Sequence, residues 1–419
     1  MKILFLLGMY YPKYSANGLC CKNVIDECVR CGLEVICIVN SYNGNKSDFE
    51  LDGAKIYPIK PRITYRLMEW CEGHPKSKLK RIIILFSNIV NKIQLALGYF
   101  SWPYISPLYT RSFLKKAEYL HKKQAFDAVI SVYTPIDSLY AGYKLKSKFS
   151  NLIYIPYYLD ALAGGWGPNQ WSVKKKERRL RFWEKRIANK ADAIFSMESS
   201  KAYHTQFPLP NNINEKRFYL DVPMMLPSIA NKTKRGLKKY ALFAGDLSYP
   251  RRDPIPLMEV FAPICKDLNI DLYLVGPYNI QSIFTPYIEA TGGRIHLLGK
   301  RAHEEVVELE QNAEFLVNIG SANPNVIPCK IFEYMRFRKP ILSTFSIDNE
   351  PSIPYLKKYG CVHFIDERIS YAESSNALKS FILQADKMCF SDDYCQNLFY
   401  LNTPKAFVDT LKKVMEEKR

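Results

Sequence analysis

Two apolar runs of strand length flank one short helical segment late in the chain, and this order restricts the fold more than any other stretch. The runs lie at residues 314–319 and 341–345, and the segment at 328–335 reads Pro-Cys-Lys-Ile-Phe-Glu-Tyr-Met. Proline is well suited to the first turn of a helix, where its missing N–H costs nothing, so we expect Pro328 there. The order strand, helix, strand predicts one βαβ unit.

The same alternation of strands and helices runs through both halves of the chain. The expected strands of the first half lie at 3–7, 34–39, 126–132, 152–158 and 193–197. The second half restarts at 240–244, 272–275 and 295–298, after a charged, turn-forming segment at 224–239.

Alternating strands and helices predict an α/β fold with a doubly wound parallel sheet in each half. We expect two Rossmann-like domains, 1–225 and 226–400, facing a cleft. Residues 401–419 are expected to form a C-terminal helix that packs toward the first domain. Ligands of such sheets bind at the carboxyl ends of the strands.

Charge is divided unequally between these halves. The whole chain has a formal net charge of +18; residues 1–225 contain 34 Lys and Arg against 18 Asp and Glu, and residues 226–419 contain 25 against 23. A strongly basic half favours a polyanionic partner, either nucleic acid or an anionic membrane surface. No recognisable nucleic-acid-binding module accompanies the basic residues, so we expect no nucleic-acid partner.

Two segments of the basic half are candidates for membrane contact. Residues 171–190 hold nine Lys and Arg against two Glu. The other segment has a helical apolar stripe, preceded by four cations: Ile82, Phe86, Ile89, Ile93, Leu97 and Phe100, after Lys76, Lys78, Lys80 and Arg81. The stripe either packs on a sheet or dips into a membrane interface, and the sequence leaves both open.

The expected location is cytoplasmic, with peripheral attachment to the inner face of the membrane. No run of 18 uninterrupted apolar residues is present, as a membrane-spanning helix would need. The 11 cysteines have no regular spacing, which is typical of reduced thiols in the cytosol.

Lys330 and Glu333 are the strongest candidate binding residues. Lys330 lies in the first turn of the expected helix, beside unpaired backbone N–H groups that favour an anion such as phosphate. Glu333 follows at the i+3 position, on the same face of the helix. A carboxylate there accepts hydrogen bonds from the hydroxyls of a sugar, so the pair suits a nucleotide.

This helix and the Arg-Lys-Pro-Ile strand at 338–341 resemble the donor-binding helix of glycosyltransferase family 4. The resemblance implies the GT-B fold and a sugar-nucleotide donor. The family pattern has two glutamates eight residues apart; here Asn325 stands at the first position and Glu333 at the second.

The resemblance also implies roles for residues outside the helix. Gly245 ends the first strand of the second half, and Arg252, with Arg251 as the alternative, precedes the next helix as a phosphate-binding arginine. Arg252 and Lys330 would clamp the diphosphate in place of a metal ion; no Asp-x-Asp motif is present, and no metal or other cofactor is expected.

In the first half, Gly18 matches a glycine that lets the backbone approach the donor. Asp160 ends a strand and is the one carboxylate well placed to face the cleft. It is a catalytic candidate, with loop capping as the alternative.

We expect a glycosyltransferase that moves a sugar from a nucleotide-diphosphate donor to a glycan or lipid-linked acceptor, and the resemblance implies that the transfer retains the anomeric configuration. Two alternatives stay open. One is a sugar-nucleotide epimerase of the same fold, and the other is a non-enzymatic polyanion-binding protein.

Overall fold

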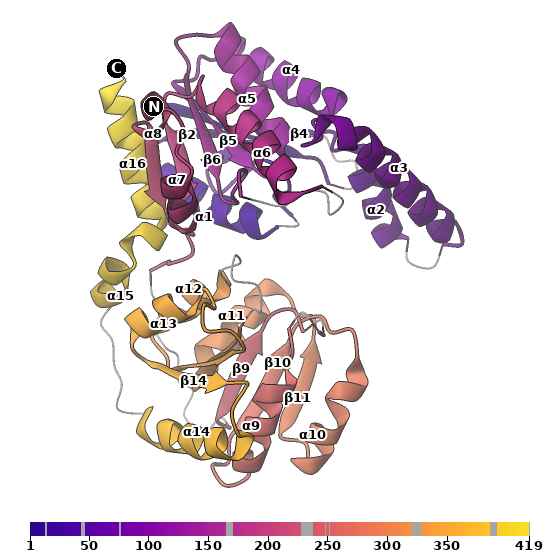
Figure 1. The fold of residues 1–419 in the computed structure, drawn as a ribbon, viewed down its shortest axis with the longest axis vertical. Helices are drawn as coiled ribbons and strands as arrows, with labels where there is room; N and C mark the ends of the chain where they lie inside the picture. The colour runs from indigo at the N-terminus through magenta and orange to yellow at the C-terminus, as the bar shows by residue number, and fades with distance from the viewer. Residues whose placement is uncertain are drawn as a thin grey trace. The chain divides into compact units, whose positions relative to one another are not determined.

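The chain forms two compact units, shown in Figure 1. The computed structural model describes residues 1–12, 15–42, 47–74, 77–164, 171–227, 238–247, 249–250, 252–320, 328–385 and 392–418. Unit 1 comprises Met1–Pro223 with Leu401–Arg419, and unit 2 comprises Met224–Tyr400. The division falls between 223 and 224, where the sequence predicted it near 225.

The described part of unit 1 contains an eight-stranded sheet in the order β3-β4-β2-β1-β5-β6-β7-β8. Its strands are β1 (Lys2–Leu6), β2 (Glu34–Asn40), β3 (Phe49–Leu51), β4 (Ala54–Ile59), β5 (Ala128–Tyr133), β6 (Ile153–Tyr158), β7 (Ile194–Met197) and β8 (Arg217–Leu220). All neighbouring strands pair in parallel except β3 with β4. The chain runs outward from β1 in one direction and later from β5 in the other, so the topological switch point lies between these two strands.

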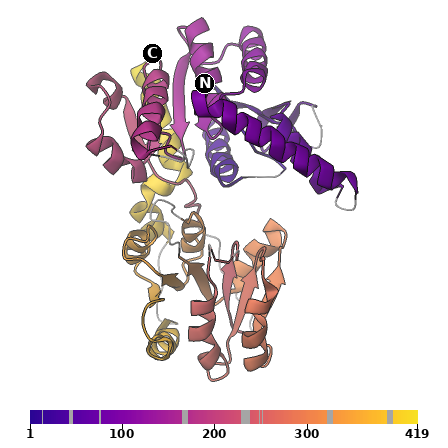
Figure 2. The same cartoon turned by 45° about the vertical axis from the view of Figure 1, so that its right-hand side comes forward.

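Helices flank this sheet, and the last of them comes from the C-terminal end of the chain. They are α1 (Ala16–Arg30), α2 (Ile63–Gly73), α3 (Leu79–Ser101), α4 (Pro107–Lys123), α5 (Ile136–Lys148), α6 (Val173–Ala188), α7 (Lys201–Gln206), α8 (Asn211–Asn214) and α16 (Pro404–Glu417). The α2–α3 hairpin extends away from the sheet, as Figures 1 and 2 show.

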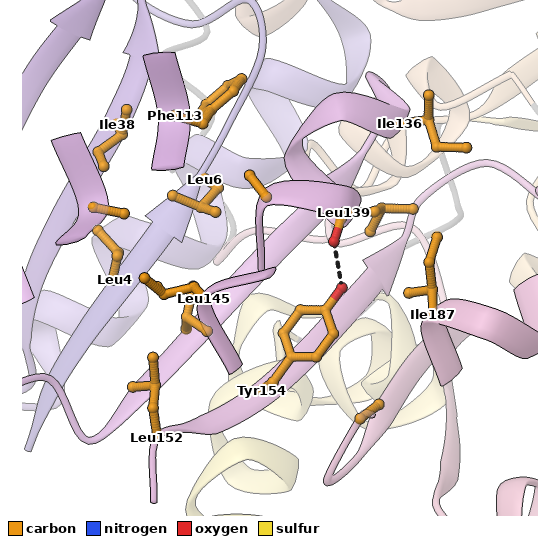
Figure 3. Close-up of a cluster of buried hydrophobic side chains, with 14 of the residues drawn as sticks. Leu4, Leu6, Ile38, Phe113, Ile136, Leu139, Leu145, Leu152, Tyr154 and Ile187 are labelled. Atoms are coloured by element: carbon orange, nitrogen blue, oxygen red, sulfur yellow. Dashed lines mark hydrogen bonds between the residues drawn. The ribbon is translucent and has the colours of Figure 1, made fainter. Parts of the chain in front are cut away.

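The core of unit 1 lies where the central strands meet α4, α5 and α6 (Figure 3). Leu4 and Leu6 on one face of β1 are fully buried there, and Ile3 and Phe5 on its other face are fully buried as well, as expected for a strand covered on both faces. A buried polar atom is also satisfied: the hydroxyl of Tyr154 donates a hydrogen bond of 2.7 Å to the carbonyl of Leu139 in α5. That bond fixes α5 against β6.

The described part of unit 2 contains six parallel strands in the order β11-β10-β9-β12-β13-β14. The strands are β9 (Tyr240–Ala244), β10 (Asp271–Val275), β11 (Ile295–Gly299), β12 (Phe315–Ile319), β13 (Ile341–Phe345) and β14 (Val362–Asp366). The helices are α9 (Ile255–Cys265), α10 (Thr285–Ala290), α11 (His303–Asn312), α12 (Lys330–Met335), α13 (Ile353–Tyr359), α14 (Tyr371–Ala385) and α15 (Asp392–Leu398). Its switch point lies between β9 and β12.

The predicted α/β class with two doubly wound parallel sheets is confirmed. The prediction for Pro328 was wrong, because α12 begins at Lys330 and Pro328 precedes it by two residues. Strands β8 and β14 were not predicted. Strands β3 and β4 were also missed, because β3 has only three residues and β4 contains Pro58, which is unusual in a strand. Their turn carries a signal in the sequence: Asp52 and Gly53 have φ of 49° and 83°, as an Asp-Gly hairpin turn requires.

Helix α16 closes unit 1 with an aromatic contact that joins distant parts of the sequence. The ring of Phe407 is 1% exposed, and its centroid lies 5.0 Å from that of Tyr157, 5.1 Å from that of Phe195 and 6.4 Å from that of Phe5. Phe407 therefore packs on three strands of the first sheet, and the C-terminal segment belongs to the core of unit 1.

Replacing Phe407 with alanine should lower the free energy of unfolding of unit 1 by about 3–5 kcal/mol, because it leaves a large buried cavity. Denaturant titration of the variant measures the effect. Phe182→Ala is the control, since that ring is 50% exposed and its loss should cost far less. Equal losses in the two variants would contradict the assigned role of α16.

Candidate functional site

Three glycines directly follow strands of unit 2, at the carboxyl ends of the strands near the switch point. Gly245 follows β9, Gly276 follows β10 and Gly320 follows β12. Gly276 has φ of 143°, and a Cβ atom there would lie 1.7 Å from the carbonyl oxygen of Gly245. No other residue fits at 276, so the backbone, and not side chains, lines the sheet at the carboxyl ends of β9 and β10.

Lys330 begins α12 and lies between two buried carboxylates. Its Nζ is 2.7 Å from Oε1 of Glu310 in α11 and 2.8 Å from Oε2 of Glu333 in α12. Glu310 is fully buried and the side chain of Glu333 is 6% exposed, whereas that of Lys330 is 26% exposed. The ammonium group is thus held by two carboxylates, while about a quarter of the Lys330 side chain as a whole is exposed.

Burial and neighbouring charges act in opposite directions on the pKa values of Glu310 and Lys330. Burial raises the pKa of Glu310 to about 7, while Lys330 opposes the rise and the nearby charge of Glu333 adds to it. Burial lowers the pKa of Lys330, but the two carboxylates outweigh it and the pKa is raised overall. Lys330 therefore stays protonated, and Glu310 is the member that titrates near neutral pH.

Glu310 is only partly satisfied by its neighbours. Its Oε2 has no hydrogen-bond partner among the residues that the structure describes. The ammonium of Lys330 is in ion-pair contact with the other oxygen, and Arg336 acts on the carboxylate at longer range. A buried carboxylate oxygen without a hydrogen bond carries a desolvation cost, which a bound proton would reduce.

Tyr334 links α12 to the end of β9. Its hydroxyl accepts a hydrogen bond of 3.0 Å from the backbone N–H of Ala244, the residue before Gly245. Burial raises the pKa of Tyr334, and the positive charge of Arg252 acts in the opposite direction. Arg252 therefore lies close enough to Tyr334 to act on it electrostatically. Tyr334 itself lies one helical turn beyond Lys330 in α12.

The candidate residues of unit 1 meet at the start of α1. A Cβ atom on Gly18 would lie 2.5 Å from the carbonyl oxygen of Met9, so this position requires glycine. The side chain of Ser15 caps α1 by accepting a 3.0 Å hydrogen bond from the backbone N–H of Gly18. Asp160, which follows β6, accepts a 2.7 Å hydrogen bond from the amide of Asn17. The structure thus joins Gly18 and Asp160 through Asn17.

The predicted site residues fall into two groups. Unit 2 holds Gly245, Arg252, Lys330 and Glu333, whereas unit 1 holds Gly18 and Asp160. Asn325, and Arg251 as the alternative to Arg252, lie outside the described residues.

Sequence reasoning missed Glu310, although a signal for it exists. Glu310 follows Val306 by four residues and Val307 by three, so it occupies the apolar face of α11. A carboxylate at such a position is rarely buried unless a cation pairs with it. No group of three or more His, Cys, Asp or Glu is arranged to hold a metal ion in the described part of the chain.

The apolar stripe at 82–93 is exposed rather than packed on the sheet. Its four described side chains, and Leu85 beside them, are 46–63% exposed: Ile82, Leu85, Phe86, Ile89 and Ile93. Helix α3 packs along α2, with the buried thiol of Cys71 against the carbonyl of Lys80. Among the described residues, no helix is long and apolar enough to cross a membrane.

Comparison with solved structures identifies the fold. The lipopolysaccharide outer core galactosyltransferase WaaB is 13% identical with a TM-score of 0.54, and the match covers all of both chains. HepE from Anabaena, solved with UDP-glucose, is 13% identical over 100% of this chain and 98% of its own, with a TM-score of 0.52. UDP-GlcNAc 2-epimerase from Neisseria meningitidis is 11% identical over 99% and 100%, with a TM-score of 0.54.

The chain has the GT-B fold. At these identities the matches establish the fold alone. No protein-family model matches the sequence, and no curated protein sequence matches it.

Glu310→Gln should remove a pH-dependent contribution to the stability of unit 2. Because folding raises the pKa of Glu310 from 4.5 to about 7, its stabilising contribution is full below about pH 4.5 and is lost as the pH rises through 7. The wild type should therefore lose stability relative to the variant between these values, by about 1.4 kcal/mol for each pKa unit.

Urea denaturation of both proteins at several pH values from 5 to 8 tests this. Glu304→Gln, at an exposed position on the same helix, is the control and should follow the wild type. A Glu310→Gln profile parallel to that of the wild type would show that Glu310 is ionised throughout.

Proposed function

We propose that the protein is a glycosyltransferase that takes a sugar from a nucleotide-diphosphate donor bound to unit 2. One observation carries the proposal: Lys330, the first residue of α12, is held by two buried carboxylates, and Tyr334 of the same helix contacts Ala244 at the carboxyl end of β9. In open α/β sheets, ligands bind outside the carboxyl ends of strands at the switch point. The fold, shared with WaaB and with HepE, supports the proposal.

In this proposal Arg252 and Lys330 bind the diphosphate. Both side chains are cationic, and Tyr334 lies within the electrostatic range of each. Charge-assisted hydrogen bonds to the departing phosphate oxygens would stabilise the charge that develops on the leaving group. No metal ion and no other cofactor enters the proposal.

Glu333 is proposed to hold the hydroxyls of the ribose. Its Oε2 accepts a hydrogen bond from Lys330, which leaves its other oxygen to be directed at a diol. Transfer with retention follows if the leaving phosphate accepts the proton of the acceptor hydroxyl. Gly18 and Asp160 of unit 1, and Asn325, remain proposed members of the site.

The acceptor is proposed to be a glycan carried on a lipid, with unit 1 bound peripherally to an anionic membrane at the cytoplasmic side. The exposed apolar row of α3 is flanked by the exposed cations Lys78, Arg81 and Lys92. A basic amphipathic helix of this kind lies in the plane of a membrane interface with its apolar face inward. The second predicted contact, residues 171–190, contains α6, whose Leu180 and Ile187 are buried while Lys174, Lys185 and Arg186 are exposed.

Lys330→Ala and Arg252→Ala should each reduce turnover about ten- to a hundredfold. Each removes a charge-assisted contact worth about 1.5–3 kcal/mol in the transition state. Release of UDP, GDP or ADP from a panel of nucleotide sugars, with a membrane extract as acceptor, measures turnover. Lys357→Ala is the matched control, because that lysine is exposed on α13.

Unchanged turnover in either purified variant would contradict the site. Conversion of a sugar nucleotide to its epimer without nucleotide release would instead support the epimerase alternative.

Binding to vesicles should rise with anionic lipid content and fall with added salt. Each cation near such a surface contributes about 1 kcal/mol, and salt screens it over about 8–10 Å. Replacing Lys78, Lys80 and Arg81 with Gln, or Ile82, Phe86 and Ile89 with Ser, should weaken sedimentation with vesicles and leave nucleotide affinity unchanged.

The charge-matched control replaces three cations of α4, Lys115, Lys122 and Lys123, with Gln. Equal sedimentation with neutral and anionic vesicles, or none with either, would contradict the membrane proposal.

A further inference from the structure

Helix α6 of unit 1 lies beside α5 (Figure 1), and buried polar contacts fix its rotation. The carboxylate of Glu184 accepts a hydrogen bond of 2.9 Å from the guanidinium of Arg217 in β8 and lies 3.1 Å from Nε2 of His204 in α7. All three side chains are at most 8% exposed. Trp183 and Arg186 are one residue before and two residues after Glu184, so they lie on other faces of the helix. The buried contacts therefore determine which side chains α6 presents outward, and exposed Arg186 is one of them.

Three aromatic rings pack together where α5 meets α6. Tyr140 and Tyr143 of α5 stack, with ring centroids 5.7 Å apart and ring planes at 10°. The ring of Trp183 in α6 meets that of Tyr140 edge-on, at a centroid distance of 5.7 Å. Residues 140 and 143 are three positions apart, so both tyrosines project from the same face of α5. We call Tyr140, Tyr143 and Trp183 the α5–α6 aromatic cluster.

Arg186 lies on the α5–α6 aromatic cluster. Its Cζ atom is 5.2 Å from the ring centroid of Trp183, 5.8 Å from that of Tyr143 and 5.9 Å from that of Tyr140. Each distance is within the range of a cation–π contact. The Nζ atom of Lys144 lies 5.4 Å from the centroid of Tyr140, so two cations share one ring. Both Lys144 and Arg186 are exposed.

The hydrogen-bond donors of Arg186 are not used by the part of the protein that the structure describes. Among those residues, the side chain of Arg186 donates no hydrogen bond and forms no ion pair, and the same holds for Lys144. Arg179 of the same helix differs, because its Nε donates a hydrogen bond of 2.7 Å to the carbonyl of Trp102. Three rings therefore hold the guanidinium of Arg186, and its N–H groups remain available to a ligand.

A guanidinium held in this way suits an oxyanion. Its planar arrangement of N–H groups forms paired hydrogen bonds with the oxygens of a phosphate or a carboxylate. The contact with aromatic rings restricts the side chain before a ligand arrives, which lowers the entropy cost of binding. The ammonium group of Lys144 adds a second positive charge, and a phosphomonoester carries about 1.5–2 negative charges at pH 7. The two cations therefore favour a phosphomonoester over a carboxylate or a phosphodiester, which carry one negative charge each.

The surroundings of Arg186 favour a lipid as the carrier of this phosphate. Tyrosine and tryptophan are enriched where proteins meet the headgroup region of a membrane. Phe182, which is 50% exposed, adds an apolar ring at a centroid distance of 6.0 Å from that of Trp183. The hydrogen bond from Arg179 also joins α6 to Trp102, the residue that follows α3. Helix α6 therefore lies next to the base of the hairpin whose exposed apolar row is the proposed membrane contact.

We propose that Arg186, held on the α5–α6 aromatic cluster, binds the phosphomonoester headgroup of an anionic lipid, with Lys144 as the second cation. The inference rests on the membrane attachment in the proposed function and adds the class of lipid to it. The apolar row of α3 and the other cations of unit 1 supply attraction to any anionic surface, whereas Arg186 and Lys144 select the headgroup.

Sedimentation of the full-length protein with two kinds of vesicle tests the proposal. Both contain phosphatidylcholine; one adds phosphatidic acid, a phosphomonoester, and the other adds phosphatidylglycerol, a phosphodiester, in amounts that give equal zeta potentials. Because the surface potentials match, the unspecific attraction of cations is the same for both. The wild type should bind the phosphatidic acid vesicles about three- to tenfold more tightly. Arg186→Lys keeps the charge but loses the planar donor group, so it should bind both kinds equally.

Two further variants make the test specific. Arg178→Lys is the matched control, because Arg178 is exposed on the same helix and makes no cation–π contact or ion pair with the described residues, so the lipid preference should persist. Tyr140→Leu removes the ring that Arg186 and Lys144 share, and the preference should decrease. Arg178 and Arg186 are both exposed, so neither lysine substitution should disturb folding.

Equal binding of both kinds of vesicle by the wild type, or a preference that persists in Arg186→Lys, would overturn the inference and leave the membrane attachment intact. Binding to neither kind would overturn the attachment and the inference with it. Calorimetric binding of glycerol 3-phosphate that depends on Arg186, without a preference between the vesicles, would assign the site to a soluble phosphate ester and overturn the lipid assignment. Failure of the wild type to bind any nucleoside diphosphate would contradict the transferase function alone, and a measured headgroup preference would still support the site at Arg186.

Discussion

One ammonium group, that of Lys330, faces two buried carboxylates in unit 2, and the proposed chemistry of the protein depends on this contact. Glu310 and Glu333 come from different helices, so the ion pairs also fix α12 against α11. Removal of one partner from a buried ion pair typically costs about 3–5 kcal/mol, because a charge is left without compensation. Any variant at 330 must therefore be checked for folding before its activity is interpreted.

The contact has a further consequence for ligand binding. A diphosphate that attracts Lys330 weakens its interaction with Glu310, and that carboxylate is fully buried, with one oxygen lacking a hydrogen-bond partner among the described residues. Ionisation of Glu310 then becomes still less favourable, since Glu333 and Tyr334 offer no positive charge and Arg336 acts only at longer range. In the ligand-free protein the two carboxylates hold the ammonium group of Lys330. When a diphosphate binds Lys330, a proton can take the place of the ammonium group as the partner of the Glu310 carboxylate.

Much of the fold could be predicted from the sequence because its strands are continuous apolar runs separated by helical patterns. Strands such as β9 and β13 lie at the residues expected. The Lys330–Glu333 pair was also predictable, since a spacing of three fixes two side chains on one helical face. The contact to Glu310 was not, because it joins residues twenty positions apart and depends on how α11 packs.

The surface of unit 1 was predictable only in part. The helical periodicity of the sequence identified the apolar stripe that includes Ile82 and Phe86. A packed helix and an exposed one have the same periodicity, so only the structure could show that the stripe is exposed. The contact of Arg186 with the α5–α6 aromatic cluster joins two helices, and no local motif marks it. Sequence patterns thus found the elements, whereas the Arg186 and Glu310 contacts required tertiary structure.

Calorimetric titration with UDP, GDP and ADP at pH 8, in two buffers of different ionisation enthalpy, measures whether a diphosphate engages Lys330 and leaves Glu310 to take up a proton. If a diphosphate engages Lys330, Glu310 takes up a proton, so the apparent binding enthalpy differs between the buffers for at least one nucleotide. The difference should disappear in Glu310→Gln while binding persists. Equal enthalpies in both buffers for the wild type, or an unchanged difference in the variant, would contradict the proposed coupling of diphosphate binding at Lys330 to protonation of Glu310.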